Sequence, residues 1–134
     1  MLRHKPLVAS LILAGLLAAT DASALGLGRL NVTTALGQPL VAEVDLSPMP
    51  GEDADSIRAN VASPAVYRSA NVEYQGVLQN IRAQVLQRPN GQPYVRLTSS
   101  QSINDPYLDI LLEVNSSTGR LVREYVFLLD PPGA

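Results

Sequence analysis

The chain has 134 residues, of which 10 are Lys or Arg, 12 are Asp or Glu and one is His, and it contains no Cys. Its one His and its one Lys, His4 and Lys5, both lie in the first six residues, in a segment that we expect to be removed. The rest of the chain therefore has no His-based acid–base couple, Cys nucleophile, Schiff-base Lys or His/Cys zinc site. This composition excludes most familiar enzyme chemistries, and we expect neither catalytic activity nor a cofactor or metal.

The N-terminal residues have the pattern of a secretory signal peptide. Positive charges at Arg3 and Lys5 precede an apolar run over residues 7–19, and an A-S-A cleavage motif ends at Ala24. The run is shorter than the roughly 20 apolar residues that span a membrane, so an uncleaved anchor is the less favoured alternative. We predict cleavage after Ala24 and export of residues 25–134 to the periplasm, without a membrane span.

The exported part is acidic, with eight Arg against eleven Asp or Glu beyond residue 24. Its arginines are spread singly along the chain, whereas nucleic acids and anionic membrane surfaces require clustered positive charge, so we expect neither as a partner. Because there is no Cys, the fold has no disulfide and depends on its hydrophobic core. The length is sufficient for one core and indicates a single domain.

Beyond the signal segment, the dominant period of the apolar residues is two. The expected strands are residues 27–34, 40–46, 57–61, 81–85, 94–99, 107–115 and 119–129. About seven short strands separated by turn residues predict an all-β fold, an antiparallel β-sandwich of the immunoglobulin-like type. Ser63 followed by Pro64 predicts the N-cap and first position of one short helix over residues 63–70. Residues 47–56, rich in Pro, Gly and acidic side chains, are expected to form a loop.

An Asn-Gly pair ending at Gly91 predicts a hairpin between the fourth and fifth strands. A loop over residues 89–93 would set Val85 against Leu97, so that apolar side chains meet. A strict two-residue turn would instead set Val85 against Arg96. We favour the longer loop, because the buried face determines the register of a hairpin.

The last two strands are joined through residues 116–119, and the inner face of the final strand stays open. Leu121, Tyr125, Phe127 and Leu129 lie on one side with Arg123, and Val122, Val126 and Leu128 lie on the other with Glu124. On the strand before, Asp109 and Glu113 share the outward face at a separation of about 13 Å, given roughly 3.3 Å per residue. That is too far for a catalytic carboxylate pair, so we expect solvated charges paired across strands.

One acidic cluster has a spacing that calcium loops also use. Asp53 and Asp55 are two residues apart, but the glycine and the distal glutamate of a calcium loop are missing. We therefore expect a solvated acidic loop.

Two blocks of the sequence share their pattern with a known bacterial family. The first runs from Leu25 through T-A-L-G-Q-P-L at residues 34–40, and the second runs from Leu97 to Pro132, with N-D-P-Y-L-D at residues 104–109. These blocks resemble the N-terminal periplasmic domain of the FimV family (FimV, HubP and relatives). The resemblance implies a role at the cell pole, in type IV pilus assembly and in twitching motility. It also implies a longer architecture, in which a LysM module, one membrane span and an acidic cytoplasmic region follow this domain.

The chain departs from that architecture because it stops at Ala134, where family members continue towards LysM. Both a fragment of a longer protein and a stand-alone version fit this end. A contact with peptidoglycan would then need the missing neighbouring module. The function that we expect is a non-enzymatic periplasmic interaction domain, whose partner is a periplasmic protein of pilus assembly or of the cell envelope.

The terminal hairpin supplies the side chains that we expect to be exposed and to contact the partner, namely Asp109, Glu113, Arg120 and Arg123. Residues 27–34 are a second candidate if they form an edge strand, because a sheet edge can accept another chain. The alternative function is a peptidoglycan- or carbohydrate-binding module. It is disfavoured because such modules present aromatic platforms, whereas this chain has no Trp and few other aromatic residues.

Overall fold

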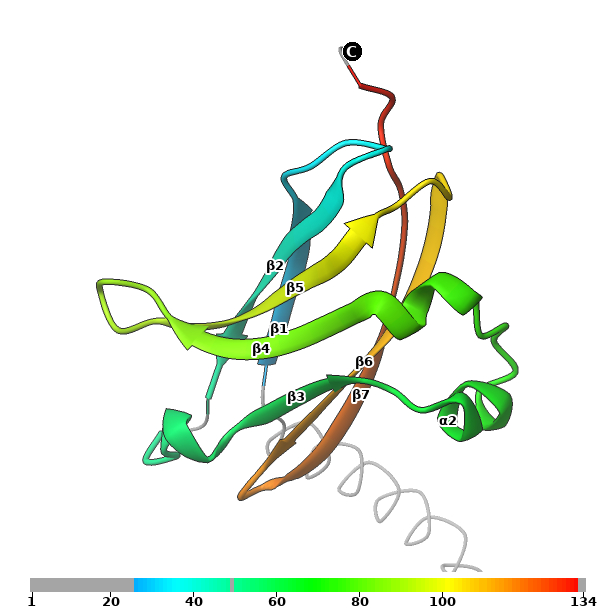
Figure 1. Cartoon of the computed structure of the whole chain (residues 1–134). Coiled ribbons are helices and arrows are strands. Elements are labelled where there is room, and N and C mark those ends of the chain that lie inside the picture. Colours follow the sequence, from blue (N-terminus) through cyan, green and yellow to red (C-terminus); the bar gives the residue numbers. More distant parts are fainter. Residues whose placement is uncertain (1–25, 49, 133–134) are drawn as a thin grey trace, which may run out of the picture.

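The structure is a computed structural model, which describes residues 26–48 and 50–132 (Figure 1). The predicted signal segment, residues 1–24, lies outside the described residues. The elements in chain order are β1 (Gly26–Val32), β2 (Pro39–Ser47), η1 (Ala54–Ser56), β3 (Arg58–Val61), α2 (Pro64–Ser69), η2 (Gly76–Asn80), β4 (Ile81–Gln87), β5 (Pro93–Ser102), β6 (Tyr107–Ser116) and β7 (Gly119–Leu128). In the part of the chain that the structure describes, no helix has the length and apolar character needed to cross a membrane.

The strands form two antiparallel sheets, one with the order β1-β2-β5-β4 and one with the order β3-β6-β7 (Figure 1). This is the strand order of a constant-type immunoglobulin domain. The predicted all-β sandwich of about seven strands is therefore confirmed. The predicted short helix is α2, which begins as expected, with the Ser63 hydroxyl accepting the Val66 N–H and with Pro64 in the first turn.

The period of two builds the core between the sheets. Every second side chain of β2 is buried, namely Leu40, Ala42, Val44 and Leu46. The facing sheet contributes Ile110 and Leu112 of β6, which are fully buried. Burying a large aliphatic side chain stabilises a fold by about 1.5–3 kcal/mol, so a core of this kind can hold a domain that has no disulfide.

The β4–β5 hairpin has a register that differs by two residues from the predicted one. Val85 pairs with Val95 and not with Leu97, and the loop spans residues 88–92. The turn is tighter than predicted, because the Arg88 N–H donates to the Gln92 C=O at 2.9 Å, the Gly91 N–H donates to the Arg88 C=O at 2.8 Å, and Gly91 has a φ of 91°. The Arg88 guanidinium binds the carboxylates of β2 at 2.9–3.0 Å. A shift of two residues preserves the face of every side chain, so apolar still meets apolar, as predicted.

The inner face of β7, which the sequence left open, is the one that carries Tyr125. Tyr125 is 7% exposed, whereas Val126 and Leu128 are 52% and 70% exposed. Of the two charges involved, Arg123 lies on the inward set and Glu124 on the outward set. The physical reason lies in contacts between β7 and β1, which are described below.

Candidate interaction surface

The outward side chains of β6 and β7 form one continuous surface, which we call the outer β6–β7 face. Its members are Tyr107, Asp109, Leu111, Glu113 and Asn115 of β6, and Arg120, Val122, Glu124, Val126 and Leu128 of β7. The antiparallel register places Tyr107 opposite Leu128, and Asp109 opposite Val126. Side chains opposite each other in such a ladder are in contact range, so these residues act as one surface.

Apolar side chains are concentrated on this face. Among the described residues, the large hydrophobic side chains that are exposed are Tyr107, Val122, Val126 and Leu128, and all four belong to it. Single exposed apolar side chains are ordinary on soluble proteins, but a contiguous apolar patch marks an interaction site or a binding groove. Three of them, Val122, Val126 and Leu128, were not predicted to be exposed, because the sequence pattern does not assign the inner face of β7.

Asp109 is not exposed, contrary to the expectation from the sequence. It is 9% exposed, and its Oδ1 atom has no hydrogen-bond partner among the described residues. The reason is the chain after α2, which lies against β6 at this position. Burial, together with hydrogen bonding and charge repulsion from Glu124, raises the pKa of Asp109 to about 6.

Residues 71–75, which we call the covering segment, and the helix α2 before them are held against the edge of β6 by two side chains. The Tyr67 hydroxyl of α2 accepts the Leu111 N–H at 2.8 Å and donates to the Asp109 C=O at 3.1 Å. The Gln75 amide accepts the Asp109 N–H at 3.0 Å and donates to the Tyr107 C=O at 2.8 Å. These side chains continue the ladder that β3 makes with the other half of β6, so the buried backbone groups stay satisfied.

The end of α2 directs the chain to this position. Asn71 has a φ of 61°, in the left-handed region. The Val72 N–H donates to the Tyr67 C=O at 2.9 Å, and the Asn71 N–H donates to the Arg68 C=O at 3.1 Å. This is a Schellman termination with Asn in the position that Gly usually takes. It turns the chain back, so that Gln75 reaches β6.

Glu113 is paired with a charge across the hairpin, as expected from the sequence, and its partner is Arg120. The Arg120 Nε donates to a Glu113 carboxylate oxygen at 2.8 Å, across the hairpin. The hydrogen bond from Arg120 lowers the pKa of Glu113 below its usual value. This pair is a closed ion pair on the half of the face near the hairpin turn.

Arg123 points away from the outer β6–β7 face. Its guanidinium donates to the Leu27 C=O of β1 at 2.6 Å and lies 5.1 Å from the centre of the Tyr125 ring. The Tyr125 hydroxyl donates to the Gly28 C=O at 2.8 Å. The two side chains therefore fasten the edge of one sheet to the edge of the other. Of the four candidate residues from the sequence, three share the outer β6–β7 face and Arg123 does not.

The contacts of Arg123 and Tyr125 with β1 also affect whether this strand could accept another chain by strand addition. The strand is at the edge of its sheet, as the sequence analysis required. Two of its carbonyl groups, Leu27 and Gly28, already accept hydrogen bonds from β7. A shift in the register between Leu27 and Leu30 also interrupts the ladder with β2. Irregular, partly covered edges are poor templates for another strand.

A pocket of about 490 Å³ opens beside Asp109, lined by residues 70–73, Gln75, Tyr107, Asp109 and Glu124. Its size falls in the range of roughly 300–1,000 Å³ typical of ligand sites. Asp109 and Glu124 are diagonal neighbours on the outer β6–β7 face, because Asp109 pairs with Val126 and Leu111 pairs with Glu124. Glu73 brings a third carboxylate from a distant part of the sequence.

Comparison with known proteins identifies the family. The family model described as the FimV N-terminal domain, an Ig-like domain, matches residues 25–132. The chain belongs to the FimV N-terminal domain family. It is 36% identical over 132 residues to the motility hub protein FimV of Pseudomonas aeruginosa, in strain PAO1 and in strain UCBPP-PA14. The match covers 98% of this chain but 14% of each of these relatives. No solved structure matches the chain.

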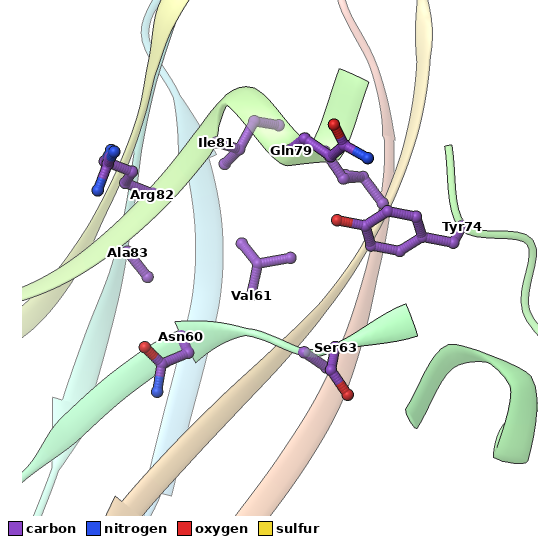
Figure 2. Close-up of a pocket in the computed structure, with 10 residues that line it drawn as sticks. Asn60, Val61, Ser63, Tyr74, Gln79, Ile81, Arg82 and Ala83 are labelled. Atoms are coloured by element: carbon purple, nitrogen blue, oxygen red, sulfur yellow. The ribbon is translucent and has the colours of Figure 1, made fainter. Parts of the chain in front are cut away.

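A second hollow of this FimV-family domain lies between the edge strands β3 and β4. Figure 2 shows Val61 of β3 and Ile81 of β4 in the space between the two strands, with Tyr74 at one end. Its volume is about 300 Å³, and Asn60 and Arg82 lie at its rim. The lining includes one hydroxyl nucleophile, Ser63, but its oxygen caps α2 by accepting the Val66 N–H at 3.4 Å. This hollow therefore has no paired acid and base.

The acidic loop of the domain has a structural role. The Asp53 carboxylate accepts the Asp55 N–H at 3.0 Å and caps η1. Within residues 26–48 and 50–132, no group of three or more His, Cys, Asp or Glu side chains is placed to hold a metal ion.

Proposed function

We propose that this domain is a non-enzymatic interaction module, which binds a partner protein through the outer β6–β7 face. The observation that carries the proposal is the gathering of Tyr107, Val122, Val126 and Leu128 on one face. Each of these side chains loses water-exposed apolar area when a partner covers it, which is the main driving force of association. The name of the relatives, motility hub protein, fits a domain that binds other proteins.

We further propose that the domain works in the periplasm, after cleavage of the signal segment at Ala24. The signal pattern in residues 1–24 and the match to the FimV N-terminal domain family support this location. The partner would then be a periplasmic protein of pilus assembly or of the cell envelope, and the process would be twitching motility and organisation of the cell pole.

A surface that recognises sugar is supported less well by the described residues. The outer β6–β7 face carries one aromatic side chain, Tyr107. On the other sheet, the Tyr94 ring is covered by the Arg88 guanidinium at 4.2 Å. Carbohydrate platforms require aromatic rings that are open to the ligand, so protein recognition remains the better proposal.

The test replaces apolar side chains on the outer β6–β7 face in the bacterium that encodes the chain. In the Val126→Thr/Leu128→Thr variant, Thr keeps the preference for a strand while removing most of the apolar contact. We expect the twitching zone to shrink several-fold at an unchanged protein level.

The matched control is Arg82→Thr/Gln84→Thr, on the exposed side of the edge strand β4. It also places two Thr residues on one strand, and we expect twitching as in the parent strain. Normal twitching of the Val126→Thr/Leu128→Thr strain would show that the outer β6–β7 face is not the functional surface.

A further inference from the structure

The pocket beside Asp109 has an excess of negative charge without a cation. Glu73, Asp109 and Glu124 line it, and no salt bridge within the described part of the chain involves any of the three. The nearest ion pair on the same face, between Glu113 and Arg120, is closed on itself. The charge of the pocket is therefore available to a ligand.

Asp109, the most buried of these carboxylates, has an oxygen atom that makes no hydrogen bond to any residue that the structure describes. Asp109 is about nine-tenths buried, lines the pocket, and has an Oδ1 atom without a hydrogen-bond partner among the described residues. A buried carboxylate oxygen without a partner is costly, since it has lost water and gained nothing in return. A cation that entered the pocket would offset the charge of Asp109 and of Glu124 beside it.

The chemistry of the surroundings defines the cation. Metal ligation is a poor fit, because the described carboxylates do not form a group placed to hold a metal ion. The rim of the pocket is apolar, with Tyr107 lining it and with Val126 opposite Asp109. A Lys or Arg side chain matches both features, since its methylene stem packs on apolar surface while its charged head binds carboxylates.

We propose that the Asp109–Glu124 pocket receives a Lys or Arg side chain of the partner protein, whose apolar neighbours pack on Tyr107, Val126 and Leu128. This proposal rests on the function proposed above and adds the chemistry of the partner. The partner segment is then a basic residue flanked by apolar residues. An arginine can bind one carboxylate with two parallel hydrogen bonds, and a lysine can bridge two carboxylates.

The proposal has a consequence for pH. The titratable groups that face Asp109 are Glu124 from β7, Tyr67 from α2 and Glu73 across the pocket. Without a ligand, burial and Glu124 raise the pKa of Asp109 to about 6. A bound cation favours the ionised carboxylate, so its pKa falls on binding and a proton is released. Binding should therefore weaken as the pH falls below 6.

The experiment selects ligands without assuming their identity. A phage-displayed library of random 12-residue peptides is selected on the purified protein at pH 7.5. An enriched peptide is then synthesised in two forms, one with its Lys or Arg and one with Gln in that place. Fluorescence polarisation measures the affinity of each form.

Three protein variants locate the contact. Asp109→Asn/Glu124→Gln removes the two carboxylates that β6 and β7 contribute to the pocket, and Val126→Thr/Leu128→Thr removes apolar side chains at its rim. Asp55→Asn/Asp130→Asn is the control for charge, because it also removes two exposed negative charges but lies outside the pocket and the outer β6–β7 face.

We expect the enriched peptides to contain Lys or Arg beside apolar residues. The Gln form and the Asp109→Asn/Glu124→Gln protein should each weaken binding at least tenfold. The Asp55→Asn/Asp130→Asn protein should bind like the parent, and the affinity of the parent should fall about threefold to fourfold between pH 7.5 and 5.5.

Two results would overturn the proposal in distinguishable ways. If the peptide needs Val126 and Leu128 but binds equally well in its Gln form, the basic side chain is wrong and the interaction face stands. If no enriched peptide needs Val126 and Leu128, both the basic side chain and the outer β6–β7 face are wrong. Equal weakening by the two charge variants would also overturn the proposal, because long-range charge would then explain the binding.

Discussion

Each sheet has a pair of carboxylates on its outer face, and the two pairs differ in whether a cation meets them. On the four-stranded sheet, Arg88 binds Glu43 at 3.0 Å and Asp45 at 2.9 Å, and its guanidinium covers the Tyr94 ring. On the outer β6–β7 face, the Asp109–Glu124 pair meets no cation within the described residues. The carboxylate pair of the four-stranded sheet thus has its cation, and the Asp109–Glu124 pair has none in the part of the chain that the structure describes.

The difference follows from what folding requires of each face. Alternation fixes which side chains enter the core, but it leaves the outward positions free for other uses. Proteins tend to break local rules, such as the pairing of buried charges, at sites that serve function. The uncompensated carboxylates and the exposed apolar side chains occupy the same face, which is why we assign binding to it and not to the four-stranded sheet.

Of the substitutions that compare the two sheets, Tyr67→Phe is expected to change the free energy of unfolding most. The Tyr67 ring is fully buried, and its hydroxyl serves two backbone groups of β6, the Leu111 N–H and the Asp109 C=O. Tyr67→Phe leaves both groups without this partner, at about 1–3 kcal/mol for each buried group. We expect the free energy of unfolding, measured with urea, to fall by about 2–4 kcal/mol.

Tyr94→Phe is the matched control on the four-stranded sheet. Its ring lies on the outward face of β5, and its stacking with Arg88 needs no hydroxyl. We expect a change within about 0.5 kcal/mol, as for substitutions away from buried hydrogen bonds. A similar small change for Tyr67→Phe would mean that the side-chain bridge to β6 does not support the covering segment.

Much of the fold can be predicted from the sequence because its signals are local. Alternating apolar residues predicted all the strands, and Ser63 with Pro64 predicted the start of α2. The predicted register of the β4–β5 hairpin was wrong by two residues, because the turn closes tightly between Arg88 and Gln92, with Gly91 at a φ of 91°. Apolar alternation does not distinguish registers that differ by two residues, since both keep every side chain on the same face.

On the candidate surface, contacts within one hairpin could be predicted from the sequence, and contacts between distant segments could not. The closed pair of Glu113 and Arg120 was predictable, since both residues belong to one hairpin. The burial of Asp109 was not, because the segment that covers it begins at Asn71, and only its left-handed conformation turns Gln75 towards β6. The pocket thus combines segments whose proximity is a product of the whole fold.

The two carboxylates of β6 should respond to pH with opposite signs. The pKa of Asp109 is raised in the folded protein, so its folded form binds a proton more readily than its unfolded form does. Stability from this group is therefore full below the unfolded pKa, near 3.9, and is lost as the pH rises to about 6. Asp109→Asn removes this loss, and we expect about 2 kcal/mol more stability than the parent at pH 7 and no gain at pH 3.5.

Glu113→Gln is the comparison for this prediction. The pKa of Glu113 is lowered by Arg120, so its contribution is present above the unfolded pKa and is lost as the pH falls. Urea unfolding of Glu113→Gln should therefore show a loss of about 0.5–1 kcal/mol at pH 7 that disappears near pH 3.5. If both variants changed stability in the same direction at pH 7, the contrast between Asp109, which has no cation among the described residues, and Glu113, which is paired with Arg120, would be wrong.

The smallest effect on stability should come from the residues that matter most for binding. Val126 and Leu128 are exposed, so replacing both with Thr removes little buried area in the free protein. We expect the free energy of unfolding of Val126→Thr/Leu128→Thr to change by less than about 1 kcal/mol. Ile110→Ala, on the buried side of the same hairpin, should cost about 2–5 kcal/mol because it leaves a cavity. A large loss in the Thr variant would show that these side chains hold the fold, and a surface that the fold itself needs would be a poor candidate for a partner.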